Sequence, residues 1–557
     1  MTRNRLAFLA AAVLAAAALT RPVVAQKGGA GAAHLQLVEA TAAELQLAIQ
    51  TRLLTVERLV DMYLARIAAY DDAGPGINAF IHVNANAAAE ARQMDALRHP
   101  GKARRPLEGL PVALKDIIDT ADMPTTGGSL SLEGSVPPDD AFITRKLREA
   151  GAIIIGKLTL TEFANFIALG MPTGYSSLGG YGFNPYDPRV LPGGDGRPVL
   201  ITGGSSSGSG LVVNANMAAL AVGTETSGSI LSPASANGVV GIKPTVGLVS
   251  RDGIIPITAD QDTAGPITRT VADAALLLGV LAGFDPADAA TAACLTPGNC
   301  FSDYTRFLDR KALKGARIAV PPLPNTVPSR EPIIRAAIDV LRAQGAYVEQ
   351  IPALPPQLGI CVAYPPPDGC STVLLYGQKR DMDAYLATRT GSPMGSLADI
   401  VAFNQAHPDP ARAIKYGQAI FEAAAMIDTS PGSADTQRYE ADRAEDLARS
   451  RGALDDIYDG PDNVKGTADD FDAILAPANF FAGTPAKAGY PSVTVPGGFL
   501  PPDGVIENPW PVTVTFSGPA FSEPRLIALA YAFEQATRHR VPPASTPPLP
   551  SDSVRRR

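Results

Sequence analysis

Two glycine- and serine-rich segments in the middle of the chain hold the side chains best suited to chemistry. They are GGSSSGSG at residues 203–210 and GTETSGSI at residues 223–230. Such segments expose backbone N–H groups and small hydroxyls at tight turns, where these groups can bind or attack a polar group. A flexible linker is the alternative, but linkers rarely lie between apolar runs or recur downstream. The segments therefore predict a site that uses serine hydroxyls.

A serine nucleophile needs a base, and histidine is the first residue to consider. Residues 204–208 match G-x-S-x-G, the nucleophile elbow of serine hydrolases. Of the chain's five histidines, only His407 and His539 follow these serines, as the Ser-Asp-His order of elbow enzymes requires. His407 precedes a proline in an expected loop, and His539 lies between two arginines. We expect both side chains at the surface, so a histidine base is disfavoured.

A lysine can act as the base when burial lowers its pKa from about 10.4 toward neutrality. Lys115 suits this role, because it ends the apolar run LPVAL at residues 110–114 and precedes Asp116. A strand over this run would carry Lys115 from the core to the edge of a sheet. The alternative is an ordinary lysine whose head reaches solvent.

Six segments, in order along the chain, resemble the amidase signature enzymes and, within that family, the peptide amidase group. They are GLPVALKD at 109–116, GGSSSGS at 203–209, GTETSGSI at 223–230, GVVGIKPTVGLVS at 238–250, DTAGPITRTVADAA at 262–275 and AGYPSVTVP at 488–496. The resemblance runs from about Leu37 to Pro543. It implies an α/β fold with a mixed central sheet flanked by helices on both faces.

The resemblance also implies a Ser-Ser-Lys triad. Ser229 would be the nucleophile, Ser205 the bridging serine on a cis peptide bond, and Lys115 the base in its neutral form. The separation of the two serines matches the family spacing. The implied reaction is hydrolysis of a carboxamide through an acyl-enzyme to a carboxylate and ammonia or an amine. It needs no metal and no cofactor.

Backbone N–H groups would stabilise the charge that develops on the carbonyl oxygen. The resemblance assigns this oxyanion hole to Thr226, Ser227, Gly228 and Ser229. Many relatives have glycine where this chain has Ser227, which keeps the N–H donor but adds a side chain beside the hole. Five further residues match family positions and are expected to support the site: Ser206, Thr224, Glu225, Asp262 and Arg269.

The expected substrate is a small-molecule or peptide amide. The resemblance suggests a C-terminal peptide amide, and aryl, aliphatic and lactam amides stay open. One alternative is the ammonia-supplying component of a tRNA amidotransferase, which resembles the same family. Another is a non-catalytic binding protein. The net charge of −8 and the lack of a basic stripe argue against a nucleic-acid partner. Oligomeric state is left open.

The N-terminus has the order of regions typical of a secretory signal peptide. Arg3 and Arg5 precede an apolar run from Leu6 to Leu19, and Val23 and Ala25 occupy the small-residue cleavage positions. We predict a signal peptide at residues 1–25, a secreted or periplasmic protein, and no membrane attachment after cleavage. An uncleaved N-terminal anchor is the alternative.

The four cysteines form two close pairs, Cys294 with Cys300 and Cys361 with Cys370. An exported protein meets an oxidising environment, which favours two local disulfides, although other pairings and free thiols stay open. The spacings are too long for a zinc site, and no histidine lies nearby.

The organisation of the chain is expected to be one catalytic domain at residues 26–545. It would carry a peripheral variable region at about 285–455 and be followed by a disordered tail at 546–557. A helix is expected over Thr55–Asp71, after a capping box at Thr41 and Glu44. The expected strands lie in residues 77–83, 110–114, 153–155, 199–201, 217–222 and 473–475.

Two further segments have no assigned role. Residues 191–200 look like extra sequence before the first serine block and are expected to form a loop bordering the pocket. The segment Asp459–Asp470 clusters acidic residues that could offer oxygen ligands to calcium, but its spacing does not fit an EF-hand. A polar turn is the favoured interpretation of that segment.

Overall fold

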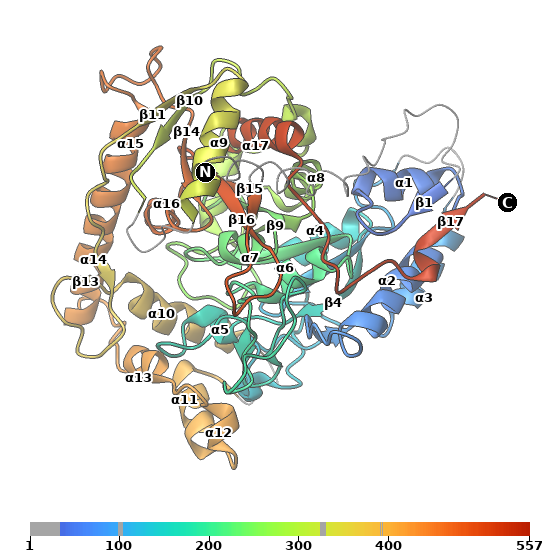
Figure 1. Cartoon of the computed structure of the whole chain (residues 1–557). Helices are drawn as coiled ribbons and strands as arrows, with labels where there is room; N and C mark the ends of the chain where they lie inside the picture. Colours follow the sequence, from blue (N-terminus) through green and yellow to red (C-terminus); the bar gives the residue numbers. More distant parts are fainter. Residues whose placement is uncertain (1–33, 99–103, 324–329, 390–391, 393, 557) are drawn as a thin grey trace, which may run out of the picture.

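The computed structural model describes residues 34–98, 104–323, 330–389, 392 and 394–556, and its centre is a sheet of 11 strands (Figure 1). In spatial order the strands are β11 (Tyr347–Gln350), β10 (Arg317–Val320), β14 (Ala473–Pro477), β16 (Trp510–Ser517), β15 (Ser492–Leu500), β8 (Val240–Lys243), β9 (Thr263–Thr268), β7 (Leu220–Glu225), β3 (Pro111–Lys115), β4 (Ile153–Leu158) and β2 (Phe80–Val83). β10 runs parallel to β11 and β14, and β3 runs parallel to β4 and β7. The other neighbours are antiparallel, so the sheet is mixed. The expected signal peptide at residues 1–25 lies outside the described residues.

The central strands are buried from end to end. β3, β4, β7, β8 and β9 contain no exposed residue. Near-continuous burial of this kind is typical of strands that are covered on both faces of a sheet.

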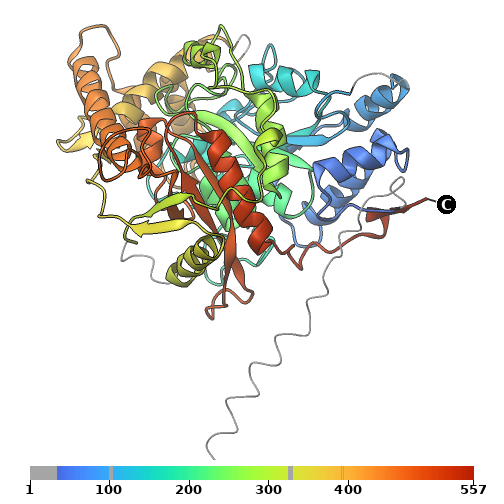
Figure 2. The same cartoon turned by 90° about the horizontal axis from the view of Figure 1, so that it is seen from above.

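Helices cover both faces of the sheet (Figures 1 and 2). α8 (Val271–Leu281) packs against β9, and α9 (Glu331–Ala343) and α17 (Glu523–Thr537) pack against β15. α6 (Ser207–Asn214) packs against β7, and α7 (Leu231–Ala236) packs against β15 and β16. The α/β architecture expected from the sequence is confirmed.

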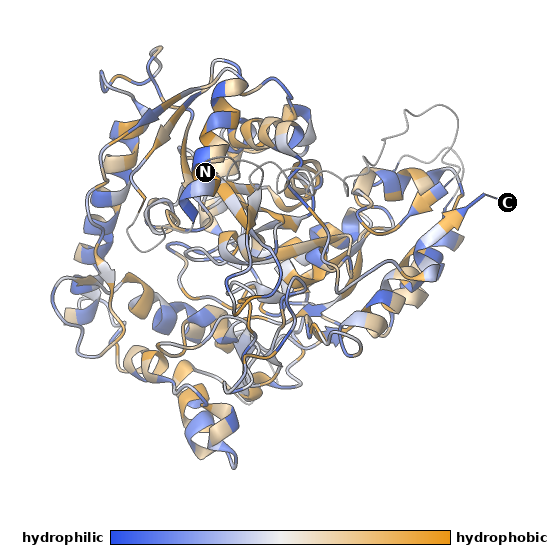
Figure 3. Cartoon of the chain, viewed as in Figure 1, coloured by the Kyte–Doolittle hydropathy of each residue, from blue (hydrophilic) through white to orange (hydrophobic). Residues whose placement is uncertain are grey.

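Apart from the four-residue α5 (Glu162–Asn165), the remaining helices flank this core, one group near β2 and β4 and the other on the left of Figure 1. Near β2 and β4 these are α1 (Ala42–Gln50), α2 (Val56–Tyr70), α3 (Ala87–Ala96) and α4 (Phe142–Glu149). The others are α10 (Val373–Ala387), α11 (Leu397–Ala406), α12 (Pro410–Ala413), α13 (Ala419–Ala425), α14 (Ala434–Leu447), α15 (Ala453–Tyr458) and α16 (Gly483–Ala488). Figure 3 shows that α14 is largely hydrophilic while the central strands are largely apolar. No helix in the described part of the chain combines the length and apolar character needed to span a membrane.

Several local expectations are confirmed. Thr41 Oγ1 accepts a hydrogen bond from Glu44 N at 3.2 Å, and the Glu44 carboxylate accepts one from Thr41 N at 2.9 Å. This capping box begins α1, and α2 fills the helix expected at 55–71. The cysteines pair locally, Cys294 with Cys300 and Cys361 with Cys370.

Residues 199–201 do not form the expected strand. Val199 N donates to Arg189 O at 2.9 Å, and Val190 forms an isolated bridge with Pro198. Pro198 precedes these apolar residues, and Gly203 and Gly204 follow them. Because proline and glycine disfavour a strand interior, the chain forms a closed loop over 190–199 instead of a strand of the sheet. Part of the region expected to be peripheral, residues 285–455, also joins the sheet. Its strands β10 and β11 form one edge of that sheet.

The tail expected to be disordered is ordered up to residue 556. Ser553–Arg555 forms β17, which pairs antiparallel with β1 (His34–Gln36). Arg66 and Asp552, both with fully buried side chains, form an ion pair at 2.5 Å. Arg66 also donates to the backbone oxygen of Thr546 at 3.0 Å. These contacts anchor a segment whose proline- and serine-rich composition alone suggests disorder.

Candidate active site

Lys115 connects the two strands that carry the site. It is the last residue of β3, and its side chain is fully buried. Lys115 Nζ donates to Ser205 Oγ at 2.8 Å and to Thr224 Oγ1 at 2.8 Å. β3 and β7 are parallel and in register at Leu114 and Val222, so Lys115 and Thr224 both lie at the carboxyl edge of the sheet. That edge is where open α/β sheets place their ligands.

The surroundings of Lys115 favour its neutral form. Burial lowers the pKa of the Lys115 ammonium to about 7, although the negative charges of Asp262 and Glu225 oppose this shift. A lysine with a pKa near neutrality can accept a proton from a neighbouring hydroxyl. Ser205 Oγ and Thr224 Oγ1 are the two hydroxyls in contact with it.

Ser205 is held in place by its backbone. The peptide bond between Gly204 and Ser205 is cis. Ser205 O accepts a hydrogen bond from Thr161 N at 3.0 Å. Gly203 has φ +68°, and a Cβ atom there would lie 2.6 Å from Pro233 Cα, so this position requires glycine. The packing leaves no space for a side chain at residue 203, and the segment brings Ser205 into contact with Lys115.

Ser229 lies in the turn that links β7 to α7, and 8% of its surface is exposed. Ser206 N donates to Ser229 O at 3.2 Å, so the two serine-bearing segments are in contact through their backbones. Among the described residues no hydrogen bond joins Ser229 Oγ to Ser205 Oγ. The turn also contains Gly228, whose φ of +83° favours glycine.

Two buried carboxylates hold the turn at residues 226–229. The Glu225 carboxylate accepts hydrogen bonds from Ile230 N at 2.8 Å and Leu231 N at 3.1 Å. The Thr226 hydroxyl donates to Asp262, and burial raises the pKa of Asp262 to about 6. These contacts fix both ends of the turn whose N–H groups are the expected oxyanion hole.

Ser206 and Arg269 act further from the reacting atoms. Ser206 Oγ donates to Thr224 O at 2.9 Å and accepts from Thr224 N at 3.1 Å, which joins the first serine segment to β7. Arg269 donates to Ala218 O at 2.9 Å and Ala40 O at 2.8 Å. Arg269 therefore fastens the N-terminal part of the chain to the core and is not brought to the site.

Neither candidate histidine reaches the serines. His407 Nδ1 contacts the backbone of Asp409, and the His407 ring packs against Phe403 at a centroid distance of 5.6 Å. The half-buried His539 ring packs against Phe533 at 6.3 Å. The geometry therefore favours lysine over histidine as the base.

A small cavity lies against the end of β7, and its lining includes residues that the sequence reasoning missed. Thr224 and Thr226 form one wall, and the apolar lining comes from Ile117, Ala164, Ile254, Ile255 and Ile257. Ala164 has φ +58°, within three successive non-glycine residues in the left-handed region. Left-handed backbone of this kind is common at functional sites, but no sequence pattern predicts it.

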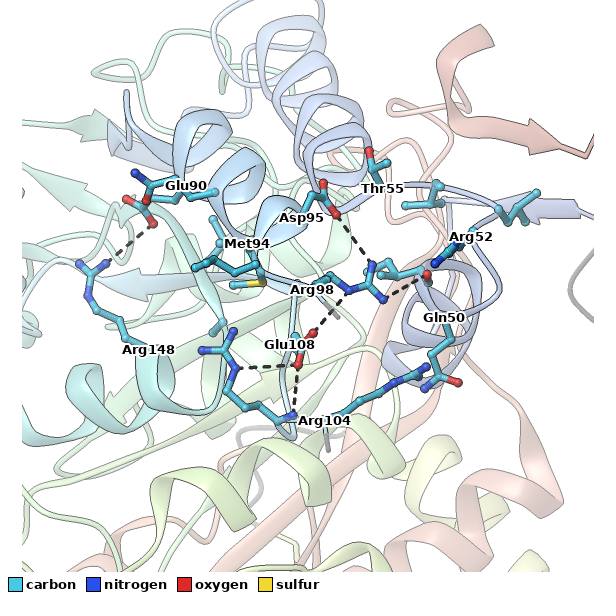
Figure 4. A pocket seen from close by; sticks show the side chains of 18 residues that line it. Gln50, Arg52, Thr55, Glu90, Met94, Asp95, Arg98, Arg104, Glu108 and Arg148 are labelled. Carbon is cyan, nitrogen blue, oxygen red and sulfur yellow. Dashed lines mark hydrogen bonds and ion pairs between the residues drawn. The ribbon is translucent and has the colours of Figure 1, made fainter. Parts of the chain in front are cut away.

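A separate groove of about 1010 Å³ lies near α1 and α3 (Figure 4). None of the expected site residues lines it. Arg98 lies 3.8 Å from Asp95 and 3.5 Å from Glu108, and Arg148 lies 3.9 Å from Glu90. Arg98 and Arg148 are thus balanced by neighbouring carboxylates.

The acidic segment Asp459–Asp470 is a self-contained turn. Asp470 accepts hydrogen bonds from Gly466 N at 2.7 Å and Thr467 N at 3.2 Å, and Asp462 accepts one from Val464 N at 2.9 Å. In the portion of the chain that the structure describes, no three or more His, Cys, Asp or Glu side chains are grouped to hold a metal ion.

Comparisons with known proteins agree with this geometry. The family model described as Amidase matches residues 58–365. A probable amidase of Arabidopsis thaliana is 37% identical over 511 residues, which cover 91% of each chain. The crystal structure of the native peptide amidase from Stenotrophomonas maltophilia is 40% identical, covers 91% of this chain and 99% of that one, and has a TM-score of 0.77. A glutamyl-tRNA(Gln) amidotransferase component of Streptomyces coelicolor is 44% identical over 253 residues, 45% of this chain and 47% of the relative.

Proposed function

The chain belongs to the amidase family, hydrolases that act on carbon–nitrogen bonds other than peptide bonds, and we propose that it works through Lys115, Ser205 and Ser229. The observation that carries this proposal is the 2.8 Å hydrogen bond from Lys115 Nζ to Ser205 Oγ. It pairs a buried lysine of lowered pKa with a hydroxyl that lies next to the Ser229 segment.

The reaction begins with proton transfer along this chain of groups. Neutral Lys115 takes the proton of Ser205, which takes the proton of Ser229 as Ser229 Oγ attacks the amide carbonyl carbon. The new C–O bond leaves negative charge on the carbonyl oxygen, which the N–H groups at residues 226–229 stabilise. Such a donor typically contributes about 3 to 4 kcal/mol to transition-state stabilisation.

The tetrahedral intermediate then breaks its C–N bond. Ser205 passes a proton to the departing nitrogen and regains one from Lys115, so ammonia or an amine leaves and Lys115 is neutral again. Water attacks the resulting ester on Ser229, using the same groups as base, and releases the carboxylate. The protein's own hydroxyls and amine carry every proton in this scheme.

The proposed substrate is a C-terminal peptide amide. The support is the 40% identity to a peptide amidase over nearly the whole of both chains. The alternative of a tRNA amidotransferase component is weaker, because such a component of Thermotoga maritima is 25% identical over 90% of this chain, with a TM-score of 0.57. A non-catalytic role does not explain the buried hydrogen bond between Lys115 and Ser205.

Export through a signal peptide at residues 1–25 is part of the same proposal. The two local disulfides support it, because disulfides persist mainly in oxidising compartments. Recovery of the mature protein from periplasm or medium with an N-terminus at Gln26 is the expected result. Recovery of full-length protein from the cytoplasm alone would contradict export.

The test of the catalytic proposal is ammonia release from a panel of peptide, aryl and long-chain primary amides. Wild type is compared with Lys115→Ala and Ser229→Ala. We expect turnover of peptide amides that both substitutions abolish. Turnover that survives Ser229→Ala would overturn the proposed mechanism.

A further inference from the structure

Asn479 is a half-buried polar residue beside the turn at 226–229 that the triad does not use. A Cβ atom placed on Gly228 would lie 3.2 Å from Asn479 Nδ2 and 3.6 Å from Ala482 Cβ. Apart from Gly228's own chain neighbours, no group lies closer to that position than the Asn479 carboxamide. Asn479 thus stands next to the segment that carries Ser229.

The backbone around Asn479 fixes where the side chain is placed. Asn479 follows β14 and Ala478, whose φ is +49°. Ala478 N donates to Thr513 O at 2.8 Å, and Ala482 N donates to Asn479 O at 3.1 Å. A left-handed alanine persists only where its surroundings hold it, and such positions cluster at functional sites.

The carboxamide of Asn479 is free for a ligand. Among the residues that the structure describes, its nitrogen and oxygen form no hydrogen bond. A carboxamide offers N–H donors and a C=O acceptor, the same pair that a peptide group offers. It can therefore bind a peptide N–H or C=O but has nothing to recognise on an unsubstituted hydrocarbon chain.

We infer that Asn479 binds the peptide group next to the scissile amide and thereby selects peptide amides over simple amides. This inference rests on the proposed function. With the scissile carbonyl oxygen at the N–H groups of 226–229, the backbone N–H of the same substrate residue is separated from the carbonyl carbon by Cα alone. In the proposed complex that N–H lies beside Gly228, next to the Asn479 carboxamide.

The test compares two primary amides that differ only in this group. N-acetyl-leucinamide carries the acetamido N–H, and 4-methylpentanamide has hydrogen in its place. For Asn479→Leu we expect kcat/KM on N-acetyl-leucinamide to fall about five- to tenfold and kcat/KM on 4-methylpentanamide to change less than about twofold. Asn479→Gln, which keeps the carboxamide, should lose less than Asn479→Leu.

Asn508→Leu is the control, because it makes the same change at an exposed asparagine that only donates to Tyr186 O. It should leave both substrates unaffected. An unchanged thermal unfolding midpoint shows that Asn479→Leu is folded. Equal losses on both substrates, or no loss on either, would overturn the inference while the amidase proposal stands. A wild type that hydrolyses simple amides but not N-acetyl-leucinamide would overturn it too. A wild type inactive on every amide would contradict the proposed function itself.

Discussion

Lys115 Nζ lies 2.8 Å from Ser205 Oγ in a site where the lysine has no exposed surface. The second acceptor of the ammonium, Thr224 Oγ1, is also neutral. Without a carboxylate in direct contact, burial outweighs the more distant charges and the pKa falls to about 7. This relationship makes the lysine a usable base and leads to the predictions below.

The pH dependence of the reaction should follow Lys115. Because the neutral amine is the active form, kcat/KM is expected to rise with pH through an apparent pKa of about 7 and then level off. Steady-state rates from pH 5 to 9 on one neutral amide measure this profile. A rate that falls as pH rises through this range would contradict a lysine base.

Removal of the Lys115 amine should have opposite effects on activity and on stability. Between pH 7 and about 10.4 the unfolded chain binds a proton that the folded lysine does not, so this group makes the fold more stable as pH rises through that window. Lys115→Met keeps most of the volume and removes this cost. We expect kcat to fall at least about 10³-fold, as for loss of a member of a catalytic triad. Urea unfolding at pH 7 should show little or no loss of stability, and a large loss would contradict the account.

Ser205 and Ser206 form a matched pair of neighbouring hydroxyls with different roles. Ser205→Ala removes the contact with Lys115 and should abolish most turnover. Ser206→Ala removes two hydrogen bonds to the Thr224 backbone and should lower the free energy of unfolding by about 1 to 3 kcal/mol. Its loss of kcat should be smaller than that of Ser205→Ala. Kinetics and urea titration of both variants measure the difference. A reversed order of the two kcat values would point to Ser206 as the proton carrier.

Glu225 should position the turn at 226–229. Glu225→Leu removes the single oxygen, Oε2, that accepts from both Ile230 N and Leu231 N, and an alkyl side chain offers no acceptor in its place. We expect a loss of about 1 to 3 kcal/mol in stability and a fall in kcat without a matching rise in KM. Glu44→Leu at the exposed capping box is the control and should leave kcat unchanged.

The C-terminal segment should contribute to stability through Asp552. Asp552→Ala leaves the guanidinium of Arg66 buried without its partner, which typically costs about 3 to 5 kcal/mol. Removal of residues 556–557 alone should cost far less, because Arg556 makes one exposed bond to Thr51 O. Thermal unfolding of both variants tests this, and equal midpoints would show that the ion pair does not anchor the tail.

Much of the site could be predicted because its chemistry is local in sequence. Short motifs contain the apolar run before Lys115 and the small residues around Ser205. The sheet then brings these two segments together. Both candidate histidines lie away from the serines, as expected, although neither side chain is fully exposed at the surface. The same motifs also predict the supporting roles of Ser206, Glu225 and Asp262.

Other features depend on contacts between distant segments, which no short pattern records. Val199–Ile201 has the composition of a strand but finds no partner strand. The composition of the tail suggests disorder, but its ion pair with Arg66, which is far away in sequence, keeps it ordered. Asn479 belongs to no motif, and only the fold of β14 beside the turn at Gly228 reveals it.

The most direct test of the account is to locate the acyl group on the enzyme. Wild type is mixed with an activated ester of an N-acetyl amino acid, quenched in acid within the first turnovers, digested and mapped by mass spectrometry. The account predicts one acyl group on Ser229, lost in Ser229→Ala and formed slowly in Lys115→Met. An acyl group on Ser205, on Ser206 or on no residue of an enzyme that is turning over would contradict it.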